Sequence, residues 1–276
     1  MAVLYVVATP LGNLGDLTAR AIEVLRTVPV VAAEDTRRTR GLLEHLGAHP
    51  ELHSFHAHSP ERRLEMLLEI LSAGRDVALV SDAGTPGVSD PGTDLVRAAR
   101  DAGHVVVPIP GPSAIATVLS ASGLAADRFL FLGFVPRRGT DRARLLARAA
   151  AEEWSVVFYE APGRVVELLE DLMALAGPRR RATVGRELTK LHEDIRHGSL
   201  EELVRHFVAT EPRGEFTVVL EGTGVPPAEA DRTEEATTSA RQLLADGITR
   251  RETSQRIAAE FGLSRNDAYR LVMSLA

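Results

Sequence analysis

The chain has 276 residues, of which 45% are hydrophobic and 25% are charged, and its formal net charge at pH 7 is −6; these values are typical of an ordinary globular protein of about two domains. The sequence contains no cysteine, which excludes disulfides, thiolate catalysis and cysteine-based zinc sites. No apolar run approaches the roughly 20 residues of a membrane span, and the negative net charge argues weakly against a general nucleic-acid binder.

The first part of the chain, residues 1–115, alternates short apolar runs with amphipathic stretches. The apolar runs are predicted as buried strands at 3–8, 30–33, 77–81 and 105–109. Apolar residues spaced by about 3.6 positions predict helices between them, at 17–27, 39–47, 60–74 and 93–103. Because strands and helices alternate, we expect a first α/β domain with a largely parallel sheet covered by helices.

A second α/β domain is expected over residues 116–224, following a segment of small residues at 113–126. Its predicted strands lie at 129–135, 155–160, 182–187 and 215–222. Its predicted helices lie at 139–152, 163–176 and 199–210.

The last part, residues 225–276, is expected to be a linker and a small helical tail. The polar segment 224–239 contains prolines at its start and is predicted as the linker. Residues 248–272 are typical of a helix-turn-helix, with a turn at Gly262 and a helix cap at Ser264. Such a motif could serve a DNA-binding regulator, an RNA contact or a surface that supports a dimer, and the sequence leaves these roles open.

The loop in VALVSDAGTPGVSDPG (77–92) follows a predicted strand and is rich in glycine. Its glycine spacing matches neither common phosphate-binding motif, and it contains no lysine. Asp82 and Asp90 would repel a polyphosphate but would tolerate a cationic ligand. A tight turn between strand and helix explains the same residues equally well.

Four more loops with unusual composition follow predicted strands, at 8–18, 32–39, 108–114 and 185–193. Each has an ordinary explanation, such as a rigid turn, a capped helix start or a solvated charge cluster. In open α/β sheets, however, ligands bind beyond the carboxyl ends of the strands. Unusual loops at several strand ends therefore favour a binding site there.

Eight segments in this order together resemble the tetrapyrrole-methylase superfamily: YVVATPLGNLGDLT, AAEDTRRT, VSDAGTPGVSDPG, PIPGPSA, FLGFVPRRG, FYEAPGR, RELTKLHE and GEFTVVLEG. EDTRRT and RELTK are similar to the branch that methylates the 2′-hydroxyl of a cytidine in small-subunit (16S) ribosomal RNA, more than to the porphyrin-methylating branches. The resemblance spans residues 3 to about 222 and includes the tail.

The resemblance implies two α/β domains with S-adenosylmethionine bound in the cleft between them, plus a small helical C-terminal region. FYEAPGR departs from the Ser-Pro-His that the family often has there. The cofactor would bind to Leu11, Gly84, Thr85, Pro86, Val88, Ser113, Ala114, Tyr159, Glu215, Phe216 and Thr217, with Gly214 beside them.

The implied reaction is attack of a ribose oxygen on the sulfonium methyl group, which positioning and desolvation would promote. A base could take the hydroxyl proton, and the candidate catalytic residues are Asp35, Glu187 and Lys190. Lys190 would need a lowered pKa for that role. Asp35 could instead pair with Arg37 or Arg186.

The implied partner is small-subunit ribosomal RNA or the assembled small subunit, in a cytoplasmic homodimer without membrane contact. Arginines suit phosphate oxygens and bases; the candidate RNA-binding residues are Arg37, Arg38, Arg137, Arg138 and Arg186. The nine histidines show no ligand spacing, so no metal site is expected. A tetrapyrrole or other small-molecule methyltransferase remains the alternative, although the arginine-rich loops and the tail would then be superfluous.

Overall fold

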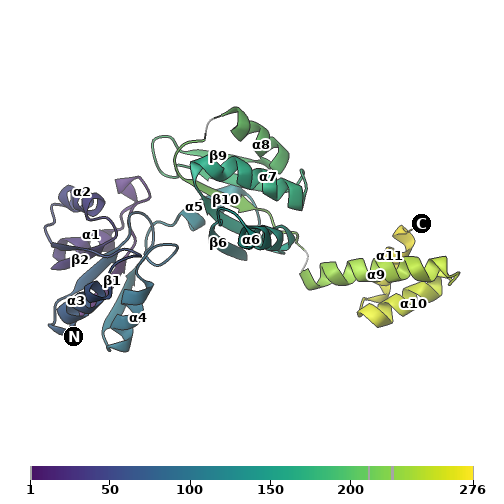
Figure 1. The fold of residues 1–276 in the computed structure, drawn as a ribbon, viewed down its shortest axis with the longest axis horizontal. Helices are drawn as coiled ribbons and strands as arrows, with labels where there is room; N and C mark the ends of the chain where they lie inside the picture. Colours follow the sequence, from purple (N-terminus) through teal and green to yellow (C-terminus); the bar gives the residue numbers. More distant parts are fainter. Residues whose placement is uncertain (1, 211, 225–226, 276) are drawn as a thin grey trace.

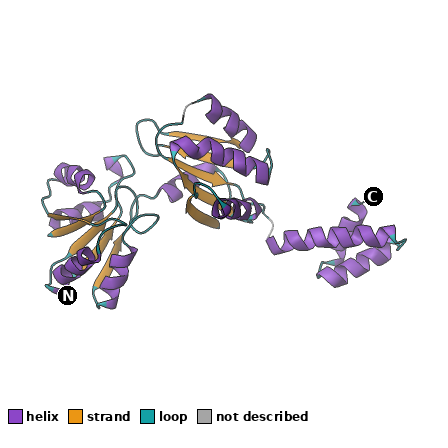
Figure 2. Cartoon of the chain, in the orientation of Figure 1, coloured by secondary structure: helices purple, strands orange, loops and turns teal. Residues whose placement is uncertain are grey.

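The structure is a computed structural model that describes residues 2–210, 212–224 and 227–275. Two sheets, each covered by helices, lie side by side, and a helical tail extends from the second (Figure 1). Figure 2 shows the strands confined to these two layers, and the described part of the tail as helices joined by short loops.

The first sheet is parallel, as the sequence predicts. It has the order β3-β2-β4-β1-β5, and every pair of neighbours runs in the same direction. All four residues of β2 and of β4 are buried, which explains their continuous apolar runs. The strands are β1 (Val3–Val7), β2 (Val30–Ala33), β3 (Glu51–Ser54), β4 (Val77–Val80) and β5 (Val105–Ile109).

Helices cover both faces of the first sheet. Helices α1 (Ala19–Thr27) and α2 (Thr36–Leu46) pack on one face through an apolar cluster that includes Leu25 and Leu43. Helices α3 (Glu61–Ser72) and α4 (Thr93–Asp101) pack on the other. A short 3-10 helix, η1 (Leu14–Asp16), lies in the loop after β1. The carboxyl ends of the parallel strands therefore share one edge, where the loops predicted to carry chemistry begin.

Helix α5 (Ala114–Ser122) follows β5 but packs on the second sheet. Its Val118 is fully buried against Val157 and Val219 of that sheet. A Cβ at Gly185 would lie 3.1 Å from Cγ2 of Val118, so glycine at this position permits the close approach of helix and strand. The helix thus joins the two halves of the chain by packing as well as by the peptide connection.

The second sheet is mixed, with the order β6-β7-β10-β8-β9. Only β6 and β7 pair in parallel, and the other neighbours are antiparallel. The strands are β6 (Phe129–Phe134), β7 (Ser155–Glu160), β8 (Arg181–Arg186), β9 (Asp194–Ser199) and β10 (Phe216–Leu220). Just before β7, Trp154 lies beneath the guanidinium of Arg128, which is 5.7 Å from its ring centroid.

Three helices cover the face of the second sheet that α5 leaves open. They are α6 (Thr140–Ala151), α7 (Val165–Ala176), preceded by the 3-10 helix η2 (Pro162–Arg164), and α8 (Leu200–Ala209). Their cluster contains Phe158, one of the largest fully buried side chains of the protein. Helix α8 begins with a capping box between Ser199 and Glu202, as its sequence pattern indicates.

The tail consists of α9 (Pro227–Ala245), α10 (Arg250–Phe261) and α11 (Arg265–Ser274). The predicted linker over 224–239 is therefore wrong from residue 227 onward, because Ala236 and Ala240 pack against Ile257 of α10 and hold α9 as a helix. The helix-turn-helix is confirmed: Gly262 has a φ of +68° at the turn, and Ser264 caps α11. Among the helices in the described ranges, none is long and apolar enough to cross a membrane.

Candidate functional site

Three loops meet at the carboxyl edge of the first sheet. Thr9, after β1, and Gly84, after β4, exchange backbone hydrogen bonds of 2.8 and 2.9 Å. The Thr85 hydroxyl donates to the Pro112 carbonyl at 3.3 Å, which ties in the loop after β5. Gly84 has a φ of +79°, a conformation that favours glycine, as expected for this loop. These contacts make the three loops one surface.

This surface faces a cavity of about 370 Å³ that both halves of the chain line. The loops after β1 and β4 and the start of α2 form one wall, and Lys190 and Glu215 from the second half form the other. The lining residues are Thr9, Pro10, Leu11, Gly12, Leu14, Arg38, Thr39, Gly41, Leu42, Ser81, Asp82, Ala83, Lys190 and Glu215. Of the predicted site residues, Leu11, Arg38, Lys190 and Glu215 thus share one cavity.

Lys190 is held between two carboxylates. Its Nζ donates to Oε1 of Glu187 at 2.9 Å and to Oε2 of Glu215 at 3.2 Å. Glu187 also accepts a hydrogen bond of 2.9 Å from the amide of Glu215. Glu187 has a φ of +49°, an uncommon and strained conformation for a residue with a side chain. A strained residue within such a network is a feature of functional sites.

The protonation of this cluster does not suit a general base. Burial raises the pKa of Glu187, but the hydrogen bonds from Lys190 and from the Glu215 amide outweigh it, and the net pKa is lowered. Burial lowers the pKa of Lys190, whereas the contacts with Glu187 and Glu215 raise it above its ordinary value. Lys190 therefore keeps its proton at neutral pH, contrary to the lowered pKa that a base at this position requires.

Asp35 has a structural role at the start of α2. Its side chain accepts from the amide of Arg37, which caps the helix, and pairs with the Arg37 guanidinium at 2.7 Å. The hydrogen bonds from the Arg37 side chain and amide lower the pKa of Asp35 to about 2. Of the two pairings that the sequence allows, the structure has the one with Arg37. An acid this strong is a weak base at neutral pH.

The two aspartates of the glycine-rich loop have different environments. Asp82 accepts from the Asp35 amide at 3.0 Å and pairs with Arg38 at 3.3 Å, so an arginine offsets its charge. Asp90 is half-buried, and burial, with the charges of Glu34 and Asp82, raises the pKa of its carboxyl to about 6. The negative field predicted for this loop therefore comes mainly from Asp90.

Several other predicted cofactor residues gather near the cavity. Leu11, Ala114 and Tyr159 pack against the apolar cluster between α5 and the second sheet. Thr217 lies opposite Tyr159 on the neighbouring strand β10. Ser113 is the N-cap residue of α5, although its side chain makes no capping hydrogen bond. In the glycine-rich loop, Pro86 is buried, Thr85 half-buried and Val88 exposed.

Phe216 faces away from this group. Its ring is 98% buried in the cluster under α6, α7 and α8, against Phe207. Because side chains alternate along a strand, Thr217 points to one face of β10 and Phe216 to the other. Only the backbone of Phe216 is available on the α5 side.

Aromatic residues near Tyr159 were not anticipated from the sequence as site residues. The Phe131 ring centroid lies 4.9 Å from that of Tyr159, and the Phe134 centroid lies 5.5 Å from it. Phe134 is 60% exposed, which is unusual for a phenylalanine at the end of a strand. The signal in the sequence was Gly133, which interrupts an otherwise apolar strand.

The predicted RNA-binding arginines fall into two kinds. Arg37 and Arg38 are paired with Asp35 and Asp82, and Arg186 donates to the Arg213 carbonyl. Arg137 and Arg138 are exposed after β6 and make no ion pair with any residue in the described ranges. These two are the arginines most available to an anionic partner.

One arginine of the same sequence cluster points inward. Arg142 is 94% buried and binds Asp171 at 2.7 Å, so it belongs to the packing of α6 against α7. A charge cluster in sequence therefore does not form a continuous positive surface in this case.

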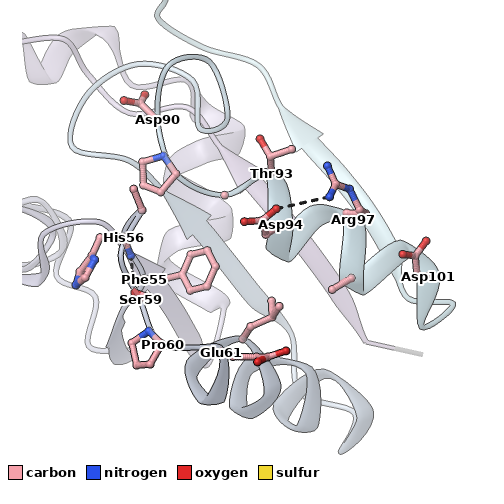
Figure 3. A pocket seen from close by; sticks show the side chains of 15 residues that line it. Phe55, His56, Ser59, Pro60, Glu61, Asp90, Thr93, Asp94, Arg97 and Asp101 are labelled. Atoms are coloured by element: carbon pink, nitrogen blue, oxygen red, sulfur yellow. Dashed lines mark hydrogen bonds and ion pairs between the residues drawn. The ribbon is translucent and has the colours of Figure 1, made fainter.

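A second cavity, of about 600 Å³, lies on the α3 and α4 side of the first sheet. Figure 3 shows Phe55, His56 and Glu61 on one wall and the Asp94–Arg97 ion pair, at 3.8 Å, on the other. Asp90 is on its rim, but the residues predicted for cofactor binding are outside its lining. We therefore place the candidate site at the smaller cavity.

The fold and the site define a class: a two-domain α/β enzyme whose cleft joins the carboxyl edge of a parallel sheet to the loops of a mixed sheet. The chain matches the family of tetrapyrrole (corrin/porphyrin) methylases over residues 3–204. It belongs to this family.

Two relatives show how closely the whole chain follows one branch. The ribosomal RNA small subunit methyltransferase I of Synechocystis sp. is 44% identical, with 100% of this chain and 99% of the relative covered. The protein of that name from Escherichia coli O157:H7 is 45% identical, with 83% of this chain and 82% of the relative covered. The first alignment includes the helical tail.

Solved structures support the fold. The methyltransferase CobJ has a TM-score of 0.62 at 20% identity, covering 82% of this chain and 98% of CobJ. The uroporphyrin-III C-methyltransferase from Thermus thermophilus complexed with S-adenosyl homocysteine has a TM-score of 0.57 at 24% identity, covering 80% and 97%. At this identity the likeness is one of fold.

Proposed function

We propose that this protein transfers a methyl group from S-adenosylmethionine to the 2′-hydroxyl of a cytidine in small-subunit (16S) ribosomal RNA. The observation that carries the proposal is the cavity between the glycine-rich loops and Lys190. It occurs in a chain that is 44% identical over its full length to a ribosomal RNA small subunit methyltransferase I.

The residues around the cavity fit the cofactor chemically. Gly84 leaves a space next to Leu11, because a Cβ there would lie 3.4 Å from Cδ2 of Leu11. Leu11, Ala114 and Tyr159 offer apolar surface for a nucleoside. The carboxylates of Asp82 and Glu215, both in the cavity lining, suit the positive charges of a sulfonium and an ammonium group. The bound cofactor supplies an electrophilic methyl group.

Lys190 has an electrostatic role in this proposal. It keeps its proton, and its positive charge lowers the pKa of a hydroxyl group brought beside it. Glu187 and Glu215 hold the ammonium group in place at 2.9 and 3.2 Å. The oxygen–methyl bond forms as the sulfonium–methyl bond breaks, S-adenosylhomocysteine leaves, and the hydroxyl proton passes to solvent, since Asp35, Glu187 and Lys190 are all poorly suited to accept it. The acceleration therefore comes mainly from positioning and charge.

The RNA is proposed to approach along the rim of the cleft that carries Arg137 and Arg138. Both side chains are exposed and can pair with phosphate oxygens. The target nucleotide has to leave its helix to reach the cavity.

We also propose a cytoplasmic homodimer. Ribosomal RNA as substrate supports the compartment. Leu191, next to Lys190, is 93% exposed, and an apolar side chain so open to water is suited to a protein contact. Light scattering after size exclusion measures the molar mass, and a mass of one chain would overturn the dimer.

The proposed activity is tested by methyl transfer from labelled S-adenosylmethionine to small ribosomal subunits and free 16S RNA from cells that lack this enzyme. We expect label in the RNA, recovered after nuclease digestion as 2′-O-methylcytidine. A tetrapyrrole and duplex DNA serve as competing acceptors. Label in the tetrapyrrole alone, or label on a base instead of a ribose, would overturn the proposal.

A further inference from the structure

The end of β6 carries an irregularity that exposes an aromatic ring to solvent. Along β6 and β7 the register changes, so that Phe131 lies opposite Val157 but Phe134 lies opposite Tyr159. One extra residue is thus inserted in β6, and Gly133 there has a φ of +64°. Such bulges re-aim a side chain. Here the re-aimed side chain is that of Phe134.

Phe134 belongs to a group of three rings, which we name the aromatic ledge: Phe131, Phe134 and Tyr159. Tyr159 lies between the other two, with centroids at 4.9 Å from Phe131 and 5.5 Å from Phe134. The Phe131 and Tyr159 rings are partly buried against α5, which fixes them. Phe134 remains 60% exposed and presents its ring to solvent from this fixed base.

The ledge lies against the glycine-rich loop. A Cβ at Gly133 would be 3.3 Å from the hydroxyl oxygen of Ser89, so the bulge and the loop are in close approach. Burial and the charge of Asp90 raise the pKa of Tyr159 to about 12, so Asp90 is also near and the phenol stays protonated. Along the chain, Phe134 is followed within four residues by the exposed Arg137 and Arg138.

An exposed ring beside the glycine-rich loop, followed in the chain by two exposed arginines without an ion pair among the described residues, fits the requirements of nucleic-acid recognition. Bases that leave their helix stack on aromatic side chains, while arginines bind the adjacent phosphates. We propose that Phe134, supported by Tyr159, is the surface on which a nucleobase of the RNA substrate stacks during methyl transfer. This inference rests on the proposed function.

The adenine of the cofactor is a nucleobase as well, and it could use the same chemistry. Leu11, Ala114 and Tyr159 already provide an apolar surface on the α5 side. Phe134 is outside that cluster, and the exposed Arg137 follows it by three residues in the chain. We therefore favour a base of the RNA, rather than the adenine of the cofactor, as the group that stacks on Phe134. The experiment below distinguishes the two.

The test compares Phe134→Ala and Phe134→Trp with Phe129→Ala. Phe129 is the matched control, since it begins the same strand, is 43% exposed and lies at the far end from the bulge. Two quantities are measured: KM for undermethylated small ribosomal subunits, and the dissociation constant of S-adenosylhomocysteine by calorimetry. Thermal unfolding of each variant checks the fold.

We expect Phe134→Ala to raise KM for the subunits by roughly tenfold to a hundredfold, the usual effect of losing one stacked base. Phe134→Trp keeps an aromatic face and retains KM within a few-fold of the wild type. Phe129→Ala leaves both quantities unchanged, and the affinity for S-adenosylhomocysteine is the same in all variants.

Two results would overturn the inference while the proposed function stands. In one, the wild type is active, but Phe134→Ala and Phe129→Ala have the same KM for the subunits. In the other, Phe134→Ala weakens the binding of S-adenosylhomocysteine and leaves KM for the subunits unchanged. That result would mean that the adenine of the cofactor stacks on the aromatic ledge. If the wild type itself transfers no methyl group to ribosomal RNA, the proposed function fails and the inference with it.

Discussion

Lys190 is the residue through which the second half of the chain reaches the loops of the first. A Cβ at Gly12 would overlap the Lys190 side chain, so the two loops are in direct contact. Both of its carboxylate partners also come from the second half. The two carboxylates therefore hold the charged end of Lys190 in a fixed position at the cavity.

We predict that Lys190→Gln lowers kcat by roughly a hundredfold, in the range found when one preorganised charge or donor is removed from an active site. Lys190→Arg keeps the positive charge and is expected to retain more activity. The measurement is kcat on small subunits, with S-adenosylhomocysteine affinity as a check on the site. Equal kcat in wild type and Lys190→Gln would exclude the electrostatic role.

Asp90 gives a pH dependence whose sign follows from its environment. Burial, with the charges of Glu34 and Asp82, raises its pKa from 3.8 to about 6. The folded state therefore binds this proton more tightly than the unfolded state, so the contribution of Asp90 to stability falls as pH rises from about 4 to about 6. Above that window the unfavourable charge is fully present.

Asp90→Asn removes this charge, and we predict a higher Tm than the wild type at about pH 7.5 and a smaller difference at about pH 4. Scanning calorimetry at the two pH values measures it. Asp94→Asn is the control, because Asp94 and Asp90 both line the larger cavity beside α3 and α4. Asp94 forms only an exposed ion pair with Arg97 at 3.8 Å, and such a pair contributes little to stability. An Asp90→Asn effect independent of pH would contradict the assignment.

At the scale of elements, the glycine-rich loop owes its shape to residues with positive φ. Gly84 and Gly87 have φ values of +79° and +82°, so a side chain at either position is strained. Only Gly84 faces Leu11 and the Pro112 carbonyl, whereas Gly87 is exposed. The two positions therefore separate backbone strain from loss of space at the cavity.

We predict that Gly84→Val and Gly87→Val lower Tm to a similar extent, because both place a β-branched residue at positive φ. Only Gly84→Val should also weaken the binding of S-adenosylhomocysteine, by roughly tenfold or more, because the methyl groups of the valine enter the space beside Leu11. Calorimetric titration measures the affinity. If Gly87→Val weakens the ligand as much, the loop shape and not the space at Gly84 controls binding.

The strands that the sequence predicted correctly carry continuous apolar runs, including β5 and β6 at sheet edges. Strands β2 and β4 have apolar residues throughout because both faces of the sheet are covered. Strands β3 and β9 were missed, and both lie at sheet edges with partly exposed residues. An edge strand is held by backbone pairing on one side, so its sequence can remain polar.

The candidate site was predictable to the same degree. Loops at strand ends could be located, since the carboxyl ends of parallel strands share an edge. Glu187 and Lys190 are three residues apart in one loop, but the pairing of Lys190 with Glu215 joins two loops distant in sequence, and no local pattern predicts it. The inward direction of Phe216 follows from its alternation with Thr217 on β10, a signal that the family resemblance obscured.

At the scale of the whole molecule, the tail has a core of its own. Ala236 and Ala240 of α9 pack with Ile257, Ala268 and Val272 of the two following helices, and every member of this cluster lies in the tail. The clusters of the two sheets contain residues up to Leu220 only. We therefore propose that residues 227–275 fold as a separate unit.

We predict that the full chain shows two unfolding transitions in scanning calorimetry, and that a chain ending at residue 224 keeps the larger one unchanged. The shortened chain should also bind S-adenosylhomocysteine with unchanged affinity, because the cavity lining ends at Glu215. A single transition that shifts downward on truncation would contradict the independence of the tail.

The position of Trp154 determines what intrinsic fluorescence can report about this protein. It is the only tryptophan of the chain, and it stands before β7, whereas Tyr159 lies near the other end of that strand, roughly 17 Å away. Intrinsic emission will therefore respond poorly to ligands in the cleft. Combining Trp154→Phe with Phe134→Trp would move the sole fluorophore onto the aromatic ledge, where base stacking should quench it.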